Sequence, residues 1–232
     1  MLPLPVCRTG GMNLPLTDTV LDPEQLWPRL RYDQLVLGGM TGELAPRLMA
    51  DFGLTVIDYY AREELQVANA VPTAEGAIQR AMEATDGTLH GSRCLVLGFG
   101  RVGKLLAYRL RNLGAQVTVA ARKYRDLAWI DALDFCSLPI GELSGHLGEF
   151  DLIFNTVPAL LLDAPRLTET KENCLLMELA SAPGGIEEGA AQRLGRRLIR
   201  APGLPGIVAP RAAARAIRES IRHILEERGE PM

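Results

Sequence analysis

The chain has 232 residues, of which 47% are hydrophobic and 23% are charged, and this balance excludes a disordered protein. The formal net charge of −3 lacks the basic excess that is typical of nucleic-acid-binding proteins. The length allows one large domain or two small ones. Because there is no long apolar run and no basic segment before the first apolar residues, we expect neither a membrane span nor a signal peptide.

The first 88 residues carry an irregular pattern of short elements. The pattern predicts strands at 4–6, 34–37 and 54–58 and a helix over 43–52. A second helix is predicted over 74–85, with Thr73 as its N-cap and Glu75 in its first turn. We therefore expect residues 1–88 to form a smaller α/β domain on the substrate or partner side, ending in a linker helix over 74–88.

From residue 93 onward, predicted strands and helices alternate regularly. The strands are expected at 93–97, 116–120, 134–137, 151–156, 174–179 and 197–201, with helices over 101–112, 124–132, 140–147 and 186–194. Such alternation is typical of an α/β fold with a parallel sheet. We predict a Rossmann-type doubly wound sheet over 89–209, followed by a C-terminal helix within 210–232 that packs back toward the N-terminal domain.

A glycine loop follows the first strand of this sheet. Residues 98–103 read Gly-Phe-Gly-Arg-Val-Gly and fit GxGxxG in its required place between a strand and a helix. We expect Gly98 to permit the turn, Gly100 to let a pyrophosphate approach, and Gly103 to let helix and strand pack closely. The alternative is a glycine turn without a ligand. The complete unit favours a dinucleotide site formed by Gly98, Phe99, Gly100, Arg101, Val102 and Gly103.

The end of the next strand indicates which dinucleotide binds. NAD sites usually carry Asp or Glu there for the ribose 2′-hydroxyl, whereas this chain has Ala121 followed by Arg122 and Lys123. Arg122 can stack on adenine and donate two hydrogen bonds to a 2′-phosphate, and Lys123 adds a second positive charge. The sequence therefore favours NADP over NAD, the alternative being an exposed basic turn.

Three further loops follow strands and therefore lie at the edge of the sheet where ligands bind in α/β folds. They span residues 155–158, 181–185 and 202–206 and are rich in Gly and Pro. In the second loop, Ser181 is expected to bind the substrate or the carboxamide of the cofactor. In the first, the residues expected to contact the cofactor are Asn155, Thr156, Val157 and Pro158.

Further substrate contacts are expected from the N-terminal domain. Arg8, with Thr9 and Gly10, follows the first predicted strand and could meet an anionic substrate. Thr73 and the N–H groups of the helix after it are expected to bind a substrate carboxylate, with simple helix capping as the alternative. The catalytic base is not identified by any motif.

Acid–base and metal-binding residues are few. Glu75 and Ser181 are the candidates for the catalytic role. His90 is expected to be structural, and His146 and His223, on predicted surface helices, are not expected to act as acid or base. The four cysteines lie far apart without metal-ligand spacing. We therefore expect no metal and reduced thiols, as in a cytoplasmic protein.

Six segments together resemble the family of dipicolinate synthase A-subunits. They are NAVPTAEG (69–76), TLHGS (88–92), VLGFGRVG (96–103), NTVP (155–158), LASAPGG (179–185) and APGLPGIVAP (201–210). The resemblance covers nearly the whole chain and implies an NAD(P)-dependent oxidoreductase that works with a flavoprotein-like B-subunit of dipicolinate synthase. It implies a small dicarboxylate substrate of the lysine pathway, a dihydro- or hydroxytetrahydrodipicolinate, which is converted to dipicolinate in the mother cell of a sporulating bacterium. It leaves a homo-oligomer open.

Two features depart from the pattern of that family. Members carry a longer N-terminal domain, so we expect the N-terminal domain here to lack its first strand–helix units. Glu178 stands where Asp is the commoner residue. Two alternatives remain: another NADP-dependent two-domain dehydrogenase of the 2-hydroxy acid or shikimate type, or a non-catalytic NADP-binding scaffold for the B-subunit. The loops at 181–185 and 202–206 lack the Arg and His that a 2-hydroxy acid enzyme needs.

Overall fold

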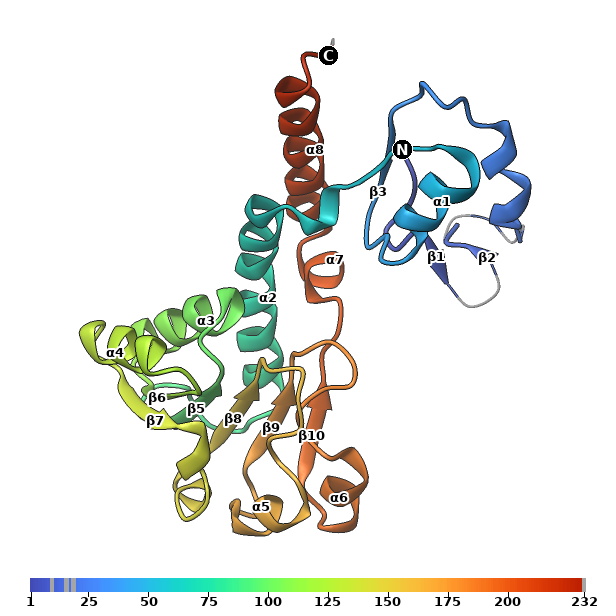
Figure 1. Cartoon of the computed structure of the whole chain (residues 1–232). Helices are drawn as coiled ribbons and strands as arrows, with labels where there is room; N and C mark the ends of the chain where they lie inside the picture. The colour runs from blue at the N-terminus through green and yellow to red at the C-terminus, as the bar shows by residue number, and fades with distance from the viewer. Residues whose placement is uncertain (9–10, 15–16, 18–19, 231–232) are drawn as a thin grey trace. The chain divides into compact units, whose positions relative to one another are not determined.

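The computed structural model describes residues 1–8, 11–14, 17 and 20–230. The chain divides into two compact units, one formed by Met1–Ala68 with Arg211–Met232 and the other by Asn69–Pro210 (Figure 1). The segment 69–88, which we expected in the N-terminal domain, thus groups with the larger unit.

The larger unit is built on a six-stranded sheet in which every neighbouring pair is parallel, with the order β10-β9-β8-β5-β6-β7. The strands are β5 (Arg93–Leu97), β6 (Gln116–Ala121), β7 (Cys136–Pro139), β8 (Leu152–Asn155), β9 (Leu175–Glu178) and β10 (Arg197–Arg200). This is the strand order of doubly wound dinucleotide-binding folds. The predicted Rossmann-type sheet is therefore confirmed.

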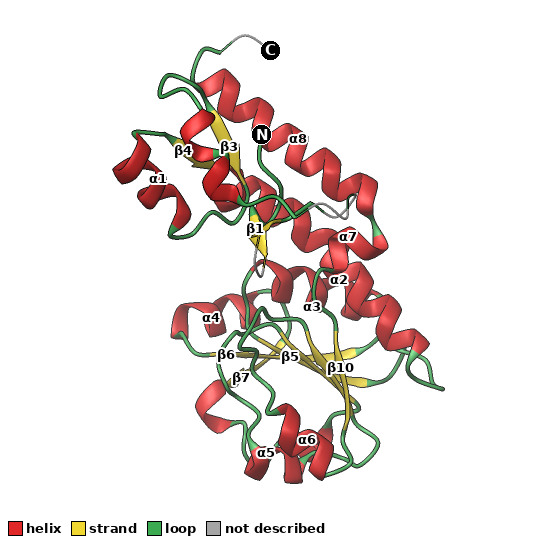
Figure 2. Ribbon diagram, turned by 90° about the vertical axis from the view of Figure 1, so that its right-hand side faces the viewer, coloured by secondary structure: helices red, strands yellow, loops and turns green. Residues whose placement is uncertain are grey.

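Helices cover both faces of this sheet (Figure 2). They are α2 (Glu63–Glu83), α3 (Arg101–Asn112), α4 (Tyr124–Ala132), α5 (Ala164–Glu169), α6 (Glu188–Arg193) and α7 (Leu204–Val208). Alternate residues of β5 enter opposite cores: Cys94 and Val96 pack with α2, α3 and α4, and Leu95 and Leu97 pack with α5 and α6. This burial of both faces explains why β5 is a continuous apolar run.

Two predicted elements of the larger unit differ from the structure. The expected helix over 140–147 is instead two short 3₁₀ turns, η4 (Ile140–Glu142) and η5 (Leu147–Glu149). Helix α2 begins at Glu63 rather than at residue 74, with Pro72 inside it. The residue before a proline disfavours helical geometry, so a proline inside a helix is uncommon. Packing overrides that preference here, since Ala70, Ala74 and Ala77 on the helix are all buried.

The smaller unit contains short elements around its own core. They are β1 (Cys7–Arg8), β2 (Gly11–Met12), η1 (Pro23–Gln25), η2 (Trp27–Arg29), β3 (Val36–Gly38), α1 (Leu44–Phe52), β4 (Val56–Asp58), η3 (Tyr59–Ala61) and α8 (Pro210–Glu227). Strands β3 and β4 pair in parallel, and Trp27, Leu48 and Leu54 are fully buried beside them. The predicted strand at 4–6 is wrong, although Val6 donates a backbone hydrogen bond to Gly39.

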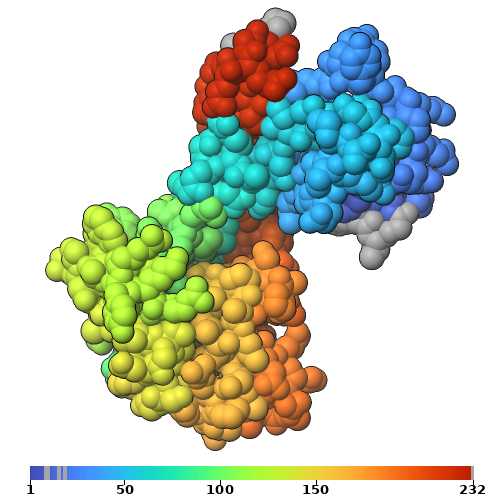
Figure 3. All heavy atoms as spheres, viewed as in Figure 1, coloured from blue at the N-terminus to red at the C-terminus, as the bar shows by residue number. Residues whose placement is uncertain are grey.

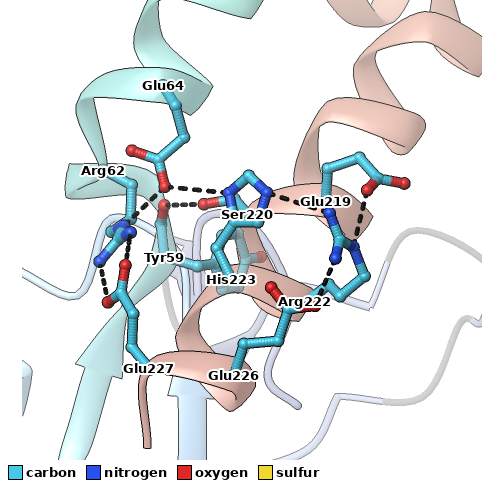
Figure 4. Close-up of polar contacts among 9 residues, drawn as sticks. All are labelled: Tyr59, Arg62, Glu64, Glu219, Ser220, Arg222, His223, Glu226 and Glu227. Atoms are coloured by element: carbon cyan, nitrogen blue, oxygen red, sulfur yellow. Dashed lines mark hydrogen bonds and ion pairs between the residues drawn. The ribbon is translucent and has the colours of Figure 1, made fainter. Parts of the chain in front are cut away.

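Helix α8 packs beside the residues just before α2 and the first residues of α2 (Figures 1 and 3). Arg62 donates to both carboxylate oxygens of Glu227, at 2.6 and 2.7 Å, and to Glu64 at 2.7 Å. His223 lies 3.7 Å from Glu64, and the Ser220 hydroxyl donates to the Tyr59 carbonyl (Figure 4). The Arg62 guanidinium lowers the pKa of both Glu227 and Glu64.

These shifts predict a pH-dependent contribution of Arg62 to stability. A carboxylate with a lowered pKa stabilises the folded state above its ordinary pKa, and this stabilisation disappears as the pH falls through the lowered value. We expect Arg62→Gln to lower the melting temperature near neutral pH, and the difference from wild type to shrink in acid. Thermal unfolding across that range measures it. Arg215→Gln, at an exposed arginine of the same helix that has no ion-pair partner among the described residues, is the control, and a difference independent of pH would contradict the prediction.

The four thiols fall into two classes. Cys94 and Cys174 are buried in the sheet, whereas Cys7 and Cys136 are exposed. Burial raises the pKa of Cys94 to about 11 and that of Cys174 to about 12. Because the thiolate is the reactive form, a thiol reagent should label only Cys7 and Cys136 in the native protein, and all four after unfolding. Labelling of Cys94 or Cys174 in the native protein would contradict the burial of these strands.

Candidate functional site

The candidate site is the carboxyl edge of the parallel sheet in the larger unit. Strand β5 pairs with β6 on one side and β8 on the other. The chain leaves β5 toward β6 and returns later to form β8, so the strand order reverses at this point. Ligands of open α/β sheets bind in the crevice beyond the carboxyl ends at such a reversal.

The glycine loop after β5 shows why Gly98 and Gly103 are required. Gly98 has a φ of +99°, and a Cβ atom there would lie 2.6 Å from the Thr156 hydroxyl oxygen. A Cβ on Gly103 would lie 2.1 Å from the Gly98 carbonyl oxygen. Both distances are far below van der Waals contact. These two glycines therefore let α3 start directly against the end of β5.

Gly100 differs from the other two glycines. Its φ of −81° and ψ of −164° suit any residue, and no atom lies within 4 Å of the position that its Cβ would occupy. The need for glycine there is therefore not internal packing. Open space beside the backbone at the N-terminus of α3 fits a pyrophosphate. Its oxygens would accept hydrogen bonds from the N–H groups that the first turn of a helix leaves unpaired.

The other three residues of the loop have different surroundings. Phe99 is 7% exposed and belongs to the core, with the Lys104 ammonium 5.2 Å from the centre of its ring. Val102 is half-buried, and Arg101 is exposed at the first position of α3. Of the three expected contacts, Arg101 alone presents an exposed side chain, so Phe99 would contribute through its backbone.

The end of β6 presents two cations. Ala121, its last residue, is buried, and Arg122 and Lys123 are exposed immediately before α4. Within the described part of the chain, neither side chain has a hydrogen-bond or ion-pair partner. The neighbouring Arg125, by contrast, lies 3.4 Å from Asp126. Arg122 and Lys123 are thus available to a phosphate.

The loop after β8 holds its polar side chains internally. Asn155 is completely buried, and the Thr156 hydroxyl donates to the Leu97 carbonyl at 2.8 Å. Val157 is half-buried and Pro158 is exposed. The hydroxyl proton of Thr156 and both amide protons of Asn155 are therefore already donated within the protein, so a contact of this loop with a cofactor would come from its backbone, its apolar side chains or the Thr156 oxygen as an acceptor.

Two residues predicted near the substrate have partners within the protein. The prediction that Thr73 caps a helix is wrong, because it lies inside α2 and its hydroxyl donates to the Asn69 carbonyl at 2.7 Å. Glu75 is exposed and lies 3.5 Å from Arg109. Glu75 therefore already has an ion-pair partner on α3.

Ser181, Arg8 and His90 are the remaining residues that the sequence singled out. Ser181 is exposed in the loop after β9, and its carbonyl accepts a hydrogen bond from the Gly184 N–H. The backbone of Arg8 lies in β1, whereas Thr9 and Gly10 lie outside the described residues. His90 precedes β5, and its ring fills the space beside Gly114, where a Cβ would lie 2.1 Å from Nδ1.

The smaller unit contains a pocket of about 360 Å³ that sequence reasoning missed. Its charged lining residues are Arg47, Glu24 and Glu43, and Arg47 already forms an ion pair with Glu24. Cys7 also lines it, and burial raises the pKa of that thiol. A lining with more negative than positive charge does not suit a dicarboxylate, so we do not assign the substrate to this pocket.

Two negative findings apply to the described residues. No cluster of three His, Cys, Asp or Glu side chains there has an arrangement that could hold a metal ion. No helix in the same ranges combines the length and the apolar character that a membrane span requires.

Comparison with known proteins gives consistent results. Residues 60–190 match the family described as D-isomer specific 2-hydroxyacid dehydrogenase, NAD binding domain. The A-subunit of dipicolinate synthase from Bacillus subtilis is 32% identical, over 97% of this chain and 77% of the relative. The solved A chain from Bacillus subtilis superposes with a TM-score of 0.90 at 30% identity, covering 97% of this chain and 76% of that one. The corresponding structure from Bacillus halodurans gives 0.89 at 32% identity, covering 97% and 78%.

Proposed function

The chain belongs to the family of dipicolinate synthase A-subunits, and we propose that it is the NADP-dependent oxidoreductase that forms dipicolinate from a dihydro- or hydroxytetrahydrodipicolinate. The observation that carries this proposal is the open backbone at Gly100, followed one strand later by two unpaired cations. Together they fit both the pyrophosphate and the 2′-phosphate of NADP.

Each part of the cofactor has candidate residues. The backbone around Gly100 and the first turn of α3 would hold the pyrophosphate, while Arg122 and Lys123 would hold the 2′-phosphate. The loops after β8 and β9 follow strands on the other side of β5 and would face the nicotinamide. When bound, NADP supplies an acceptor for a hydride.

The reaction places modest demands on the protein. A dihydropyridine dicarboxylate becomes aromatic by losing one hydride and one proton, and the hydroxytetrahydro form must first lose water. Aromatisation supplies the driving force, so orientation and charge matching are the main tasks of the chain. Ser181 is the candidate in the larger unit for a substrate carboxylate, and a contact from Arg8 stays a proposal from the sequence. The proton can pass to water, which requires no dedicated base.

We also propose a partner protein and a cellular location for this chain. Because the relatives are named as the A component of dipicolinate synthase, we propose that this chain works with a B-subunit. We place it in the cytoplasm of the mother cell of a sporulating bacterium.

The direct test is an assay with the precursor and NADP⁺, with and without the B-subunit. We expect dipicolinate and NADPH to form in equal amounts when both proteins are present. Binding of NADP⁺ without turnover, even with the B-subunit, would instead establish the scaffold alternative. Turnover with a 2-hydroxy acid but not with the precursor would establish a different dehydrogenase.

A further inference from the structure

A buried carboxylate ends β9. Glu178 is 4% exposed, and its partner in the register of the sheet is Asn155, the last residue of β8, which is fully buried. One carboxylate oxygen, Oε1, accepts from Asn155 Nδ2 at 2.7 Å and from the Ala180 N–H at 2.9 Å. The other, Oε2, accepts from the N–H groups of Gly185 at 2.7 Å and Ile186 at 3.1 Å. Four donors thus converge on a single side chain.

The orientation of Asn155 is fixed independently. Its Oδ1 accepts from the Val157 N–H at 3.1 Å, and its Nδ2 donates to the Val157 carbonyl at 2.9 Å. Turning the amide over would place like groups together at both contacts. The hydrogen bonds of Asn155 therefore hold the loop after β8 in place, and those of Glu178 hold the loop after β9. Glu178 is also hydrogen-bonded to Asn155.

Gly185 packs tightly between the loop after β8 and the loop after β9. A Cβ on Gly185 would lie 2.5 Å from Asn155 Nδ2 and 2.8 Å from the Val157 carbonyl oxygen. The Gly185 carbonyl also accepts from the N–H groups of Leu161 and Leu162. The two loops are therefore held against one another with no room for a side chain, and both oxygens of Glu178 are occupied.

We propose that Glu178 is a positioning residue that, through Asn155, sets these two loops for the nicotinamide end of the cofactor. A buried carboxylate requires a full set of donors, and here those donors come from the segments that must be placed. The inference rests on the proposed cofactor site. It separates that site into an adenosine end, set by Gly100 and Arg122, and a nicotinamide end, set by Glu178.

Glu178→Gln tests this separation. Whichever way the new amide turns, its NH₂ group meets two N–H donors, so the loops must move. We expect NADPH to bind about 10-fold more weakly or worse, and the change in nicotinamide fluorescence on binding to disappear. The affinity for 2′,5′-ADP, which lacks the nicotinamide, should stay at the wild-type value. NADH and 5′-AMP are the matching pair if the wild type prefers NAD.

The controls distinguish positioning from general stability. Asp151→Asn makes the same chemical change just before β8, at the opposite end of the sheet, where Asp151 accepts from Lys171 and from the Arg93 N–H. It should leave both affinities unchanged. Gly185→Ala forces the same loops apart without altering the carboxylate and should reproduce the Glu178→Gln result.

The outcomes separate the two proposals. Unchanged NADPH binding by Glu178→Gln, or equal losses of NADPH and 2′,5′-ADP, would overturn the positioning role while leaving the cofactor site intact. A wild-type protein that binds neither dinucleotide would overturn the proposed function itself, and with it this inference.

Discussion

Replacing Gly100 with valine is expected to weaken the binding of NADP severely while leaving the fold intact. The backbone at Gly100 is extended and suits any residue, and a Cβ there meets no atom within 4 Å. A side chain would instead occupy the space through which a pyrophosphate must approach. Losing two hydrogen bonds to a charged group, at about 1.5 kcal/mol each, corresponds to roughly 100-fold weaker binding.

Isothermal titration and thermal unfolding measure the two halves of this prediction. Gly103→Ala is the matched control, because its Cβ would lie 2.1 Å from the Gly98 carbonyl oxygen. It should lower the melting temperature, whereas Gly100→Val should change it little. NADP affinity that survives in Gly100→Val would show that the pyrophosphate does not bind at this loop.

Replacing Arg122 with alanine is expected to weaken NADP binding much more than NAD binding. The reason is that the guanidinium can donate two charge-assisted hydrogen bonds to a 2′-phosphate, which NAD lacks. At about 1.5–3 kcal/mol, the loss corresponds to roughly 10- to 100-fold. Titrations with both dinucleotides measure the ratio of affinities.

Arg125→Ala is the control for Arg122. It removes a nearby exposed arginine that already has Asp126 beside it, so NADP affinity should change little. Because exposed charges are screened by salt, the difference between wild type and Arg122→Ala should also shrink at high ionic strength. Equal losses of NAD and NADP in Arg122→Ala would contradict the assignment of this residue to the 2′-phosphate.

The sequence predicted best where structure depends on neighbouring residues. The unit formed by β5, α3 and β6 is continuous in the chain, and the expected helix over 101–112 coincides with α3. The roles of Gly98 and Gly103 in packing also follow from local motif geometry. In this segment the local sequence pattern and the tertiary fold agree, so the pattern alone was sufficient to predict the fold.

Prediction failed where tertiary packing decides. The local pattern predicts a helix that starts after Thr73, whereas α2 begins at Glu63, so the N-cap role given to Thr73 is wrong. The pairing of Asn155 with Glu178 joins residues 23 positions apart, so no local pattern contains it. One signal was available: each is a polar residue closing an otherwise apolar strand, and the two strands are adjacent in the predicted sheet.

In the proposed reaction, this chain passes a hydride from the substrate ring to NADP⁺. The most direct measurement uses the precursor labelled with deuterium at the ring carbons that lose hydrogen, incubated without oxygen with NADP⁺, this chain and the B-subunit. We expect one deuterium in the recovered NADPH for each molecule of dipicolinate formed. Dipicolinate that forms while the nicotinamide carries no deuterium would contradict it.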